Sequence, residues 1–284
     1  MAQKDLISDV VEQSPNRRSL LKKLSMAAAA TGASMVTGGL KLKADPASPT
    51  VVDVLQFALN LEYLEAEFYT TATMGKTIDQ VGIGISGAGS SGPTTGWNQV
   101  NFSNSLVFTG TIANQIGNDE RNHVTLLRTA LSNAGIQPVA KPPINLGALG
   151  IGFANEAQFL TLARVFEDIG VTAYGGAAQF SSVTSSPYIG TAAQILAAEA
   201  EHAANIRLQV ARLAIASSAL DGVDIIPPPS GTYFFSVDPN TGLTAIRTPG
   251  QVLYLAYNAA NATSGGFFPG GVNGNLHTSS GSSA

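Results

Sequence analysis

Two stretches of the chain, QIGNDERNHVTLLR at residues 115–128 and QILAAEAEHAANIR at residues 194–207, repeat one pattern of residue types without a gap. The shared types are Gln, Ile, Glu, His and Arg, and in each copy the Glu precedes the His by three positions. Residues three apart lie on one face of an α-helix, with Cβ atoms roughly 5–6 Å apart. We therefore expect Glu120 with His123, and Glu199 with His202, each to offer a carboxylate and an imidazole to the same point.

A second repeat links two other segments. Glu62 and Glu167 are each followed seven residues later by a tyrosine, Tyr69 and Tyr174. Four carboxylates buried together would repel one another, and two divalent cations would neutralise them. Carboxylate oxygen and imidazole nitrogen suit Fe or Mn, so the sequence predicts a site for two Fe or two Mn ions. The predicted metal ligands are Glu62, Glu120, His123, Glu167, Glu199 and His202.

Several residues near these positions have other interpretations. Glu65 lies on the same helical face as Glu62 and could replace or supplement it as a ligand, but only Glu62 shares the tyrosine spacing of Glu167. For Tyr69 and Tyr174, core packing and a hydrogen bond or electron relay beside the ligands both stay open. Four acids adjoin ligand positions and are expected to be solvated or to lie behind the ligands: Glu67, Asp119, Asp168 and Glu201. We also expect two arginines to pair with nearby acids and one histidine to be solvated: Arg128, Arg207 and His277.

Four segments have helical periodicity, and each is long enough to cross a domain. They cover about residues 50–73, 104–133, 155–180 and 191–217. The glycine- and serine-rich residues 75–103 suggest an insertion or a mobile flap, with Gly75 ending the first helix. Residues 135–153 contain three prolines and predict an extended crossover, whereas residues 181–187 predict a short turn between antiparallel neighbours.

The character of the chain changes after residue 218. Residues 227–229 are all proline and break any helix. Residues 233–237 predict a short strand, and Thr248-Pro249 predicts the start of a short helix to about residue 262. We thus expect an all-α four-helix bundle over residues 50–218 and a largely irregular C-terminal extension over residues 219–284.

The composition excludes several classes of function. The chain has no cysteine, which excludes disulfides, iron–sulfur clusters, thiolate zinc sites and cysteine nucleophiles. Its net charge of −4 offers no electrostatic case for a nucleic-acid partner. No segment has 18 continuous apolar residues, so a permanent membrane span is not expected.

The N-terminal residues 1–44 are set apart from the fold as targeting sequence. Arg17 and Arg18 precede a mildly apolar stretch, residues 24–40, and together these resemble a bacterial twin-arginine export signal. A basic, disordered arm is the alternative interpretation. The signal predicts a periplasmic or extracellular protein, with cleavage after Ala44 disfavoured by the lysines beside it.

The two Glu-x-x-His pairs and the two single glutamates resemble the ferritin-like superfamily, which includes rubrerythrins, bacterioferritins and manganese catalases. FALNLEYLEAEFY at residues 57–69 and GGFFPG at residues 265–270 are similar to a narrower group, the extracytoplasmic ferritin-like or desiccation-related proteins. The resemblance implies a bundle with one long crossover and the same six ligands. It also implies that Glu120, with Glu167 or Glu199, bridges the two ions.

The site and the resemblance lead to three functional hypotheses. The first is an exported dinuclear metalloprotein that performs redox chemistry on peroxide or oxygen in stress protection, like a catalase or peroxidase. The second is metal binding or ferroxidase-type sequestration without efficient turnover, and the third is a structural protein with a vestigial site. Metal ions and a small oxidant are the expected partners, and a homo-oligomer is left open.

Overall fold

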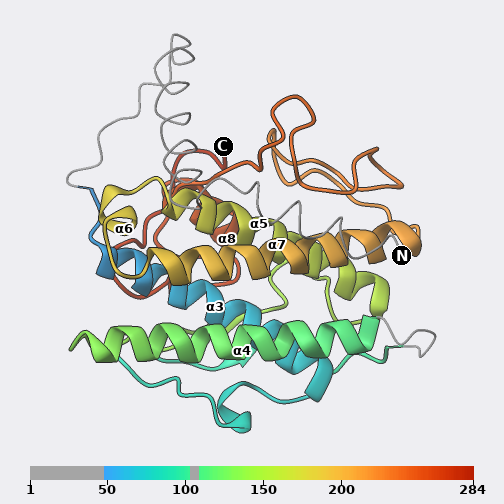
Figure 1. Cartoon of the computed structure of the whole chain (residues 1–284). Coiled ribbons are helices and arrows are strands. Elements are labelled where there is room, and N and C mark those ends of the chain that lie inside the picture. The colour runs from blue at the N-terminus through green and yellow to red at the C-terminus, as the bar shows by residue number, and fades with distance from the viewer. Residues whose placement is uncertain (1–47, 103–108) are drawn as a thin grey trace, which may run out of the picture. The chain divides into compact units, whose positions relative to one another are not determined.

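Four long helices form a bundle in this computed structural model, which describes residues 48–102 and 109–284 (Figure 1). They are α3 (Val51–Met74), α4 (Thr109–Asn133), α5 (Glu156–Ala177) and α7 (Ile189–Arg212). α3 packs along α4 and α5 packs along α7, and the two pairs meet through α3 with α5 and α4 with α7. The predicted all-α bundle is confirmed. The export signal at 1–44 and the predicted helix start at 104–108 lie outside the described residues.

The helix ends follow from local chemistry. The Thr50 side chain accepts a hydrogen bond from the Asp53 backbone N–H, and the Asp53 carboxylate accepts one from the Thr50 N–H, so a capping box opens α3. Gly75 ends α3 in the left-handed conformation with φ of 63°. Asn155 caps α5 through the backbone N–H of Gln158. Both ends of α3 and the start of α5 thus lie within one residue of the expected positions, whereas α5 ends three residues before the expected residue 180.

α3 is the central helix, because 17 of its 24 residues are buried. Its Phe68 ring stacks on Phe159 of α5 with centroids 4.9 Å apart, and Phe166 meets Phe68 edge-on at 5.1 Å. Such aromatic contacts add to the free energy gained by burying apolar area. The result is a dry aromatic layer that holds α3 against α5 in the interior of the bundle.

The glycine-rich segment after α3 is fastened to the crossover before α5. It contains η1 (Asp79–Val81) and β1 (Thr94–Thr95), and β1 pairs in parallel with β2 (Ile144–Asn145). Ala88 and Val139 form a further parallel bridge. Backbone hydrogen bonds thus tie the insertion to the crossover, which is the arrangement of an ordered cover and not of a separate flap.

Glu67 lies under this cover, and it is neither solvated nor in contact with a predicted ligand, so both expected roles are wrong. Its Oε1 is 3.4 Å from Nζ of Lys141 on the crossover, and both side chains are at most 2% exposed. Its other oxygen accepts a hydrogen bond from the Ile78 backbone N–H. A buried carboxylate needs partners of this kind, so Glu67 joins α3 to both connecting segments.

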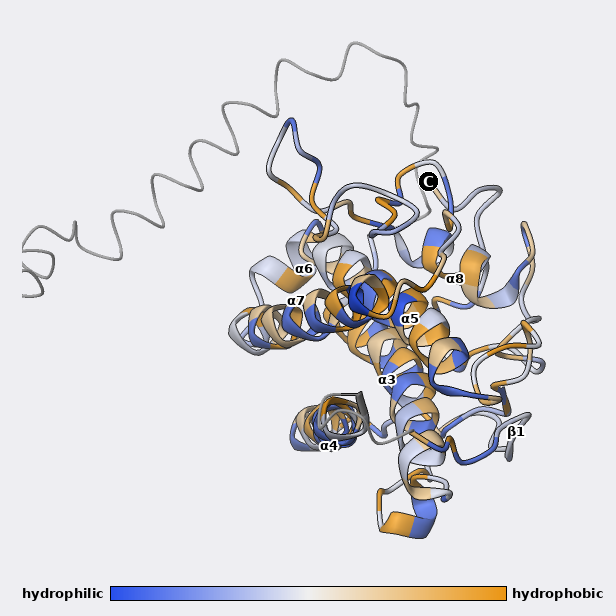
Figure 2. Ribbon diagram, turned by 90° about the vertical axis from the view of Figure 1, so that its right-hand side faces the viewer, coloured by the Kyte–Doolittle hydropathy of each residue, from blue (hydrophilic) through white to orange (hydrophobic). Residues whose placement is uncertain are grey.

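The C-terminal extension packs back onto the bundle. α8 (Pro249–Tyr257) begins at the predicted Thr248-Pro249 pair and contacts α5. In Figure 2 it lies beyond α3 and α5 on the side opposite α4 and α7. The buried side chain of Asn60 on α3 exchanges two hydrogen bonds, at 2.9 and 3.0 Å, with the backbone of Asn273 near the end of the chain. The extension is therefore an integral wall of the bundle.

The predicted strand at residues 233–237 is wrong, because only Val237 forms an isolated bridge, with Thr244. The carbonyl groups of Tyr233 and Phe234 instead accept hydrogen bonds from the guanidinium of Arg207 on α7. Those carbonyls are consequently taken by a side chain and not by a neighbouring strand.

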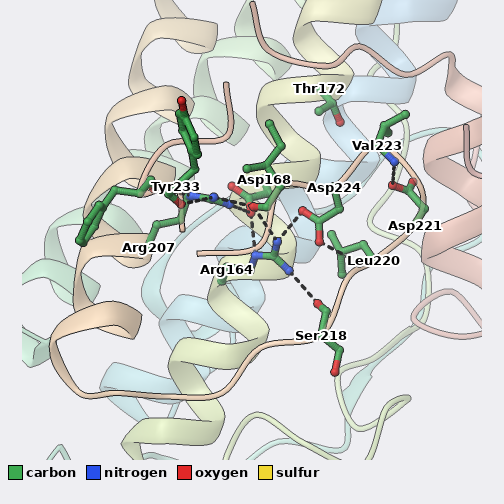
Figure 3. A network of polar contacts seen from close by, with 12 residues as sticks. Arg164, Asp168, Thr172, Arg207, Ser218, Leu220, Asp221, Val223, Asp224 and Tyr233 are labelled. Carbon is green, nitrogen blue, oxygen red and sulfur yellow. Dashed lines mark hydrogen bonds and ion pairs between the residues drawn. The ribbon is translucent and has the colours of Figure 1, made fainter. Parts of the chain in front are cut away.

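A buried ion network anchors this part of the extension (Figure 3). Nη1 of Arg207 lies 2.7 Å from Oδ2 of Asp168, and Nε of Arg164 lies 2.8 Å from the same oxygen. Arg164 also pairs with Asp224 of the extension. Arg207 thus pairs with an acid as predicted, and Asp168 is buried in the network and not solvated. Arg128 differs from expectation, because it donates to the Tyr63 hydroxyl and the Ser86 carbonyl.

Among the described residues, none of the helices combines the length and the apolar character needed to cross a bilayer.

Candidate metal centre

The four long helices each contribute to one buried polar cluster. α3 supplies Glu62, α5 supplies Glu167, and α4 and α7 each supply a Glu-x-x-His pair. The four glutamates are completely buried and the two histidine residues are at most 8% exposed. The structure thus brings together all six predicted ligands: Glu62, Glu120, His123, Glu167, Glu199 and His202.

Within the cluster, possible ligand atoms form two groups, and the atoms of each group lie within 4.8 Å of one another. The first group contains Glu62, Glu120, His123 and Glu199, and the second contains Glu120, Glu167 and His202. Glu120 belongs to both groups. Its Oε2 is 3.2 Å from Nδ1 of His123, and its Oε1 is 3.0 Å from Nδ1 of His202. A carboxylate with one oxygen on each side has the geometry of a bridge between two cations.

The second Glu-x-x-His pair does not behave as expected. Glu199 lies in the group of His123, with Oε1 and Nδ1 3.6 Å apart, and not in the group of His202. His202 instead lies 3.4 Å from Oε2 of Glu167. The i, i+3 spacing places a pair on one helical face, but it does not decide towards which neighbour across the bundle each side chain turns.

The two tyrosines of the weaker repeat cross between helices. Tyr69 on α3 donates a hydrogen bond to Oε1 of Glu167 on α5, and Tyr174 on α5 donates one to Oε1 of Glu62 on α3. Of the two open interpretations, hydrogen bonding beside the ligands is the one that the geometry bears out. Each phenol fixes the orientation of one carboxylate and leaves its second oxygen facing the cluster.

Glu65 lies beside the cluster but belongs to neither group of ligand atoms. Its side chain is 5% exposed and makes no hydrogen bond with the described residues. Burial, together with the charges of Glu199 and Glu120, raises its pKa well above the usual range. The carboxyl group of Glu65 is therefore held in its neutral form in the metal-free protein.

The pKa values of several side chains in the cluster are shifted strongly from their usual values. Burial raises the pKa of Glu62 to about 7, with His123 opposing the rise. Burial acts in the same direction on Glu120, but the hydrogen bond from His123 and the nearby imidazole of His202 outweigh it and lower the pKa of Glu120 to about 2. Burial disfavours the imidazolium forms, yet the surrounding carboxylates raise the pKa of His123 to about 11 and that of His202 to about 12. The metal-free cluster thus retains protons on both histidines.

The oxygen and nitrogen atoms of the cluster fit metal ions, because hydrogen bonds within the protein leave several of them without a partner. Several buried side-chain atoms in the cluster have no hydrogen-bond partner among the described residues. They are Oε2 of Glu62, Oε1 of Glu120, Oε2 of Glu167, both oxygens of Glu199 and Nδ1 of His202. An unpaired buried carboxylate oxygen costs several kcal/mol, and a divalent cation would satisfy these oxygen and nitrogen atoms together. The arrangement fits a metal-binding centre.

Two further residues shape the centre: Asp119, for which a position behind the ligands was one of the two expected roles, and Gly170, which the repeat does not identify. Asp119 lies 3.4 Å from Nε2 of His202 and orients the ring from behind, a common arrangement for metal-binding histidines. Gly170 on α5 lies so close to Glu199 that a Cβ atom built there would be 2.3 Å from Oε2. A glycine in a helix interior is costly, and that cost was the only sequence signal for Gly170.

Two of the acids that adjoin ligand positions in sequence contribute nothing to the centre. Glu201 is exposed on α7. Asp168 faces the arginines of the ion network and not the cluster. His277 is likewise exposed, as expected, and its Nδ1 contacts the Gly274 carbonyl at 3.0 Å.

Comparison with known proteins bears on the same segment. A family model described as a ferritin-like domain matches residues 50–212, which include all four long helices and all six predicted ligands. No curated protein matches the chain. The matched segment covers more than half of the chain, and the chain therefore belongs to the ferritin-like domain family.

Proposed function

We propose that the chain is an exported metalloprotein that holds two Fe or two Mn ions and performs redox chemistry on peroxide or oxygen. The observation that carries the proposal is the pair of ligand groups that share Glu120. Glu62, His123 and Glu199 would hold one ion, Glu167 and His202 would hold the other, and Glu120 would bridge them.

Bound Fe or Mn ions would supply two one-electron changes of oxidation state, which together match the two electrons that pass between two molecules of peroxide when they become oxygen and water. The residues of the chain would have three tasks. Tyr69 and Tyr174 orient the carboxylates that they contact. Phe68 and Phe159 pack against the ring of Tyr69, with centroids 5.1 and 5.7 Å away, and would keep water from that side of the ligands. Asp119 holds the ring of His202.

Export is proposed from the sequence alone, because Arg17 and Arg18 precede a mildly apolar stretch. Transport of folded protein would allow the metal to be loaded before export. Arg17→Lys combined with Arg18→Lys should retain the protein in the cytoplasm of a bacterial host. Export of the double variant at the rate of the parent would contradict this part of the proposal.

Peroxide turnover tests the chemical part of the proposal. The purified chain is loaded with Mn²⁺ or Fe²⁺, freed of excess ions, and mixed with hydrogen peroxide in an oxygen electrode. We expect oxygen release that persists over many turnovers and is lost in Glu120→Ala. Stoichiometric metal without turnover would favour sequestration over catalysis, and a chain without bound metal would leave only a structural role.

A further inference from the structure

A cavity of about 240 Å³ lies against the candidate metal centre, on the side of the C-terminal extension. Its walls come from α3, α5, α8 and the segments around Ala219 and Phe267. Most of the lining is aliphatic or aromatic, for example Leu61, Val165, Ile169, Val252, Leu255 and Phe267. Pockets of this kind, apolar with few polar groups, are the usual form of small-molecule sites.

Two of the lining residues also touch the carboxylate–histidine cluster, and a third, Glu65, lies beside it. Tyr174 donates its hydrogen bond to Glu62. Gly170 lies directly against Oε2 of Glu199, and Oε1 of Glu65 would be 3.3 Å from a Cβ atom at the same position. The cavity and the cluster thus share one wall, in which Gly170, without a side chain, lines the cavity and lies against Glu199.

Glu65 is the polar group that the cavity presents on this wall. It is 95% removed from solvent, it lines the cavity, and it has no hydrogen bond to the described residues. A buried carboxyl group without a partner costs free energy. A ligand with a hydroxyl group at one end would remove that cost, whereas a ligand carboxylate would lose its hydration on entering the mostly apolar cavity.

The outer wall of the cavity comes from residues beyond the ferritin-like segment, which ends at residue 212. Val252, Leu255 and Ala256 of α8 face α5 across the cavity, and Phe267 follows α8. The small side chains of Ala173 and Ala256 leave the volume open between the helices. The extension, which supplies none of the six predicted ligands, consequently builds one side of a binding site.

The size of the cavity limits its ligand. An apolar cavity of about 150 Å³ accepts benzene, so by simple scaling 240 Å³ accepts a chain of about ten carbon and oxygen atoms. We propose that the cavity binds an uncharged aliphatic molecule of this size with one hydroxyl group, placed with the hydroxyl beside Glu65 and towards the cluster. A role of such a molecule as the substrate of the metal centre rests on the proposed function. Its binding in the cavity is independent of that function.

The test is a calorimetric titration of the full chain with 1-octanol, with octanoate as the charged comparison. We expect one saturable site per chain, a negative heat-capacity change from apolar burial, and binding of octanoate at least tenfold weaker. Ala219 lies exposed at the edge of the cavity, so Ala219→Trp should close it and weaken 1-octanol binding at least tenfold. Ala216→Trp is the matched control, because Ala216 is exposed on the same segment and does not line the cavity.

Three results would overturn the inference: no saturable binding of 1-octanol, equal weakening by both tryptophan variants, or equal affinity for octanoate. Titrations of metal-free and metal-loaded protein separate this inference from the proposed function. If the protein binds 1-octanol but retains no metal after loading, the proposed function is contradicted and the cavity inference stands. Stoichiometric metal without 1-octanol binding would do the reverse.

Discussion

Tyr174 on α5 donates its hydroxyl proton to Oε1 of Glu62 on α3, while the tyrosine seven residues after Glu62 donates to Glu167 on α5. Each tyrosine of the repeat therefore supports the glutamate of the other helix. Seven residues correspond to about 10.5 Å along a helix, so a tyrosine at this spacing does not reach its own glutamate. The repeat is explained by contacts across the helix pair.

Removal of either phenol should weaken metal binding without unfolding the chain. Tyr69→Phe and Tyr174→Phe keep the ring and its packing but release one carboxylate, and loss of such a support typically costs 10- to 100-fold in metal affinity. Competition titration with a chromophoric chelator measures the change. Tyr254→Phe in α8, away from the cluster, is the control, and an affinity unchanged in both test variants would contradict the role given to the phenols.

A methyl group at Gly170 should disturb the centre more than the fold. In Gly170→Ala the new Cβ would lie 2.3 Å from Oε2 of Glu199, so that carboxylate must move. Alanine stabilises a helix by about 1 kcal/mol relative to glycine. This gain offsets part of the loss in the free energy of unfolding that the clash causes. Gly190→Ala, on α7 with nothing within 4 Å of the added Cβ, is the matched control.

We expect Gly170→Ala to bind less metal than the parent and Gly190→Ala to bind the same amount, as measured by elemental analysis after dialysis. Equal metal content in the two variants would show that Glu199 is not held where the structure places it.

The ion network around Asp168 should stabilise the fold and leave the metal centre intact (Figure 3). Asp168→Ala removes the carboxylate that Arg164 and Arg207 share, and it leaves both buried guanidinium groups without that partner. Breaking a buried pair in this way costs about 3–5 kcal/mol, and chemical denaturation should show it as a lower midpoint. Glu201→Ala, at an exposed position on α7, should change the midpoint little. Equal midpoints for both variants would mean that the network contributes nothing.

The stability of the metal-free protein should fall as the pH rises. The pKa values of His123 and His202 are raised to about 11 and 12 from the ordinary 6.5, so their contribution is fully present below pH about 6.5 and is lost as the pH climbs towards those values. The pKa of Glu62, raised to about 7 from 4.5, acts in the same direction between those two values. Calorimetry should therefore give a lower Tm at pH 9 than at pH 5.

Metal-loaded protein should show the opposite trend over the same range, because metal binding requires deprotonated ligands and becomes tighter as the pH rises. A Tm of the metal-free protein that increases from pH 5 to pH 9 would contradict the protonated histidines of the cluster.

Local sequence signals predicted the bundle and the six side chains that gather at its centre. Thr50 and Gly75 mark the ends of α3 through capping chemistry, which depends only on near neighbours. The repeat identified all six residues of the cluster, because each lies at a fixed spacing on an amphipathic helix. Spacing within a helix survives folding unchanged, which is why these predictions succeed.

Contacts between distant segments were not predictable in the same way. The burial of Glu67 depends on its ion pair with Lys141, 74 positions later in the sequence. The burial of Asp168 depends on its ion pair with Arg207. The strand expected at residues 233–237 fails because the backbone there meets a guanidinium from α7. Which side chain arrives at a given place is a property of the packing, and no local pattern encodes it.

The metal content of the folded chain decides whether the two ligand groups hold metal ions. Protein reconstituted with Fe²⁺ or Mn²⁺ and dialysed should contain two ions per chain by elemental analysis, one for each ligand group. His123→Ala and His202→Ala should each fall well below two, whereas His277→Ala, at the exposed third histidine, should match the parent. No retained metal in the folded parent protein, or the same content in all three variants, would contradict the account.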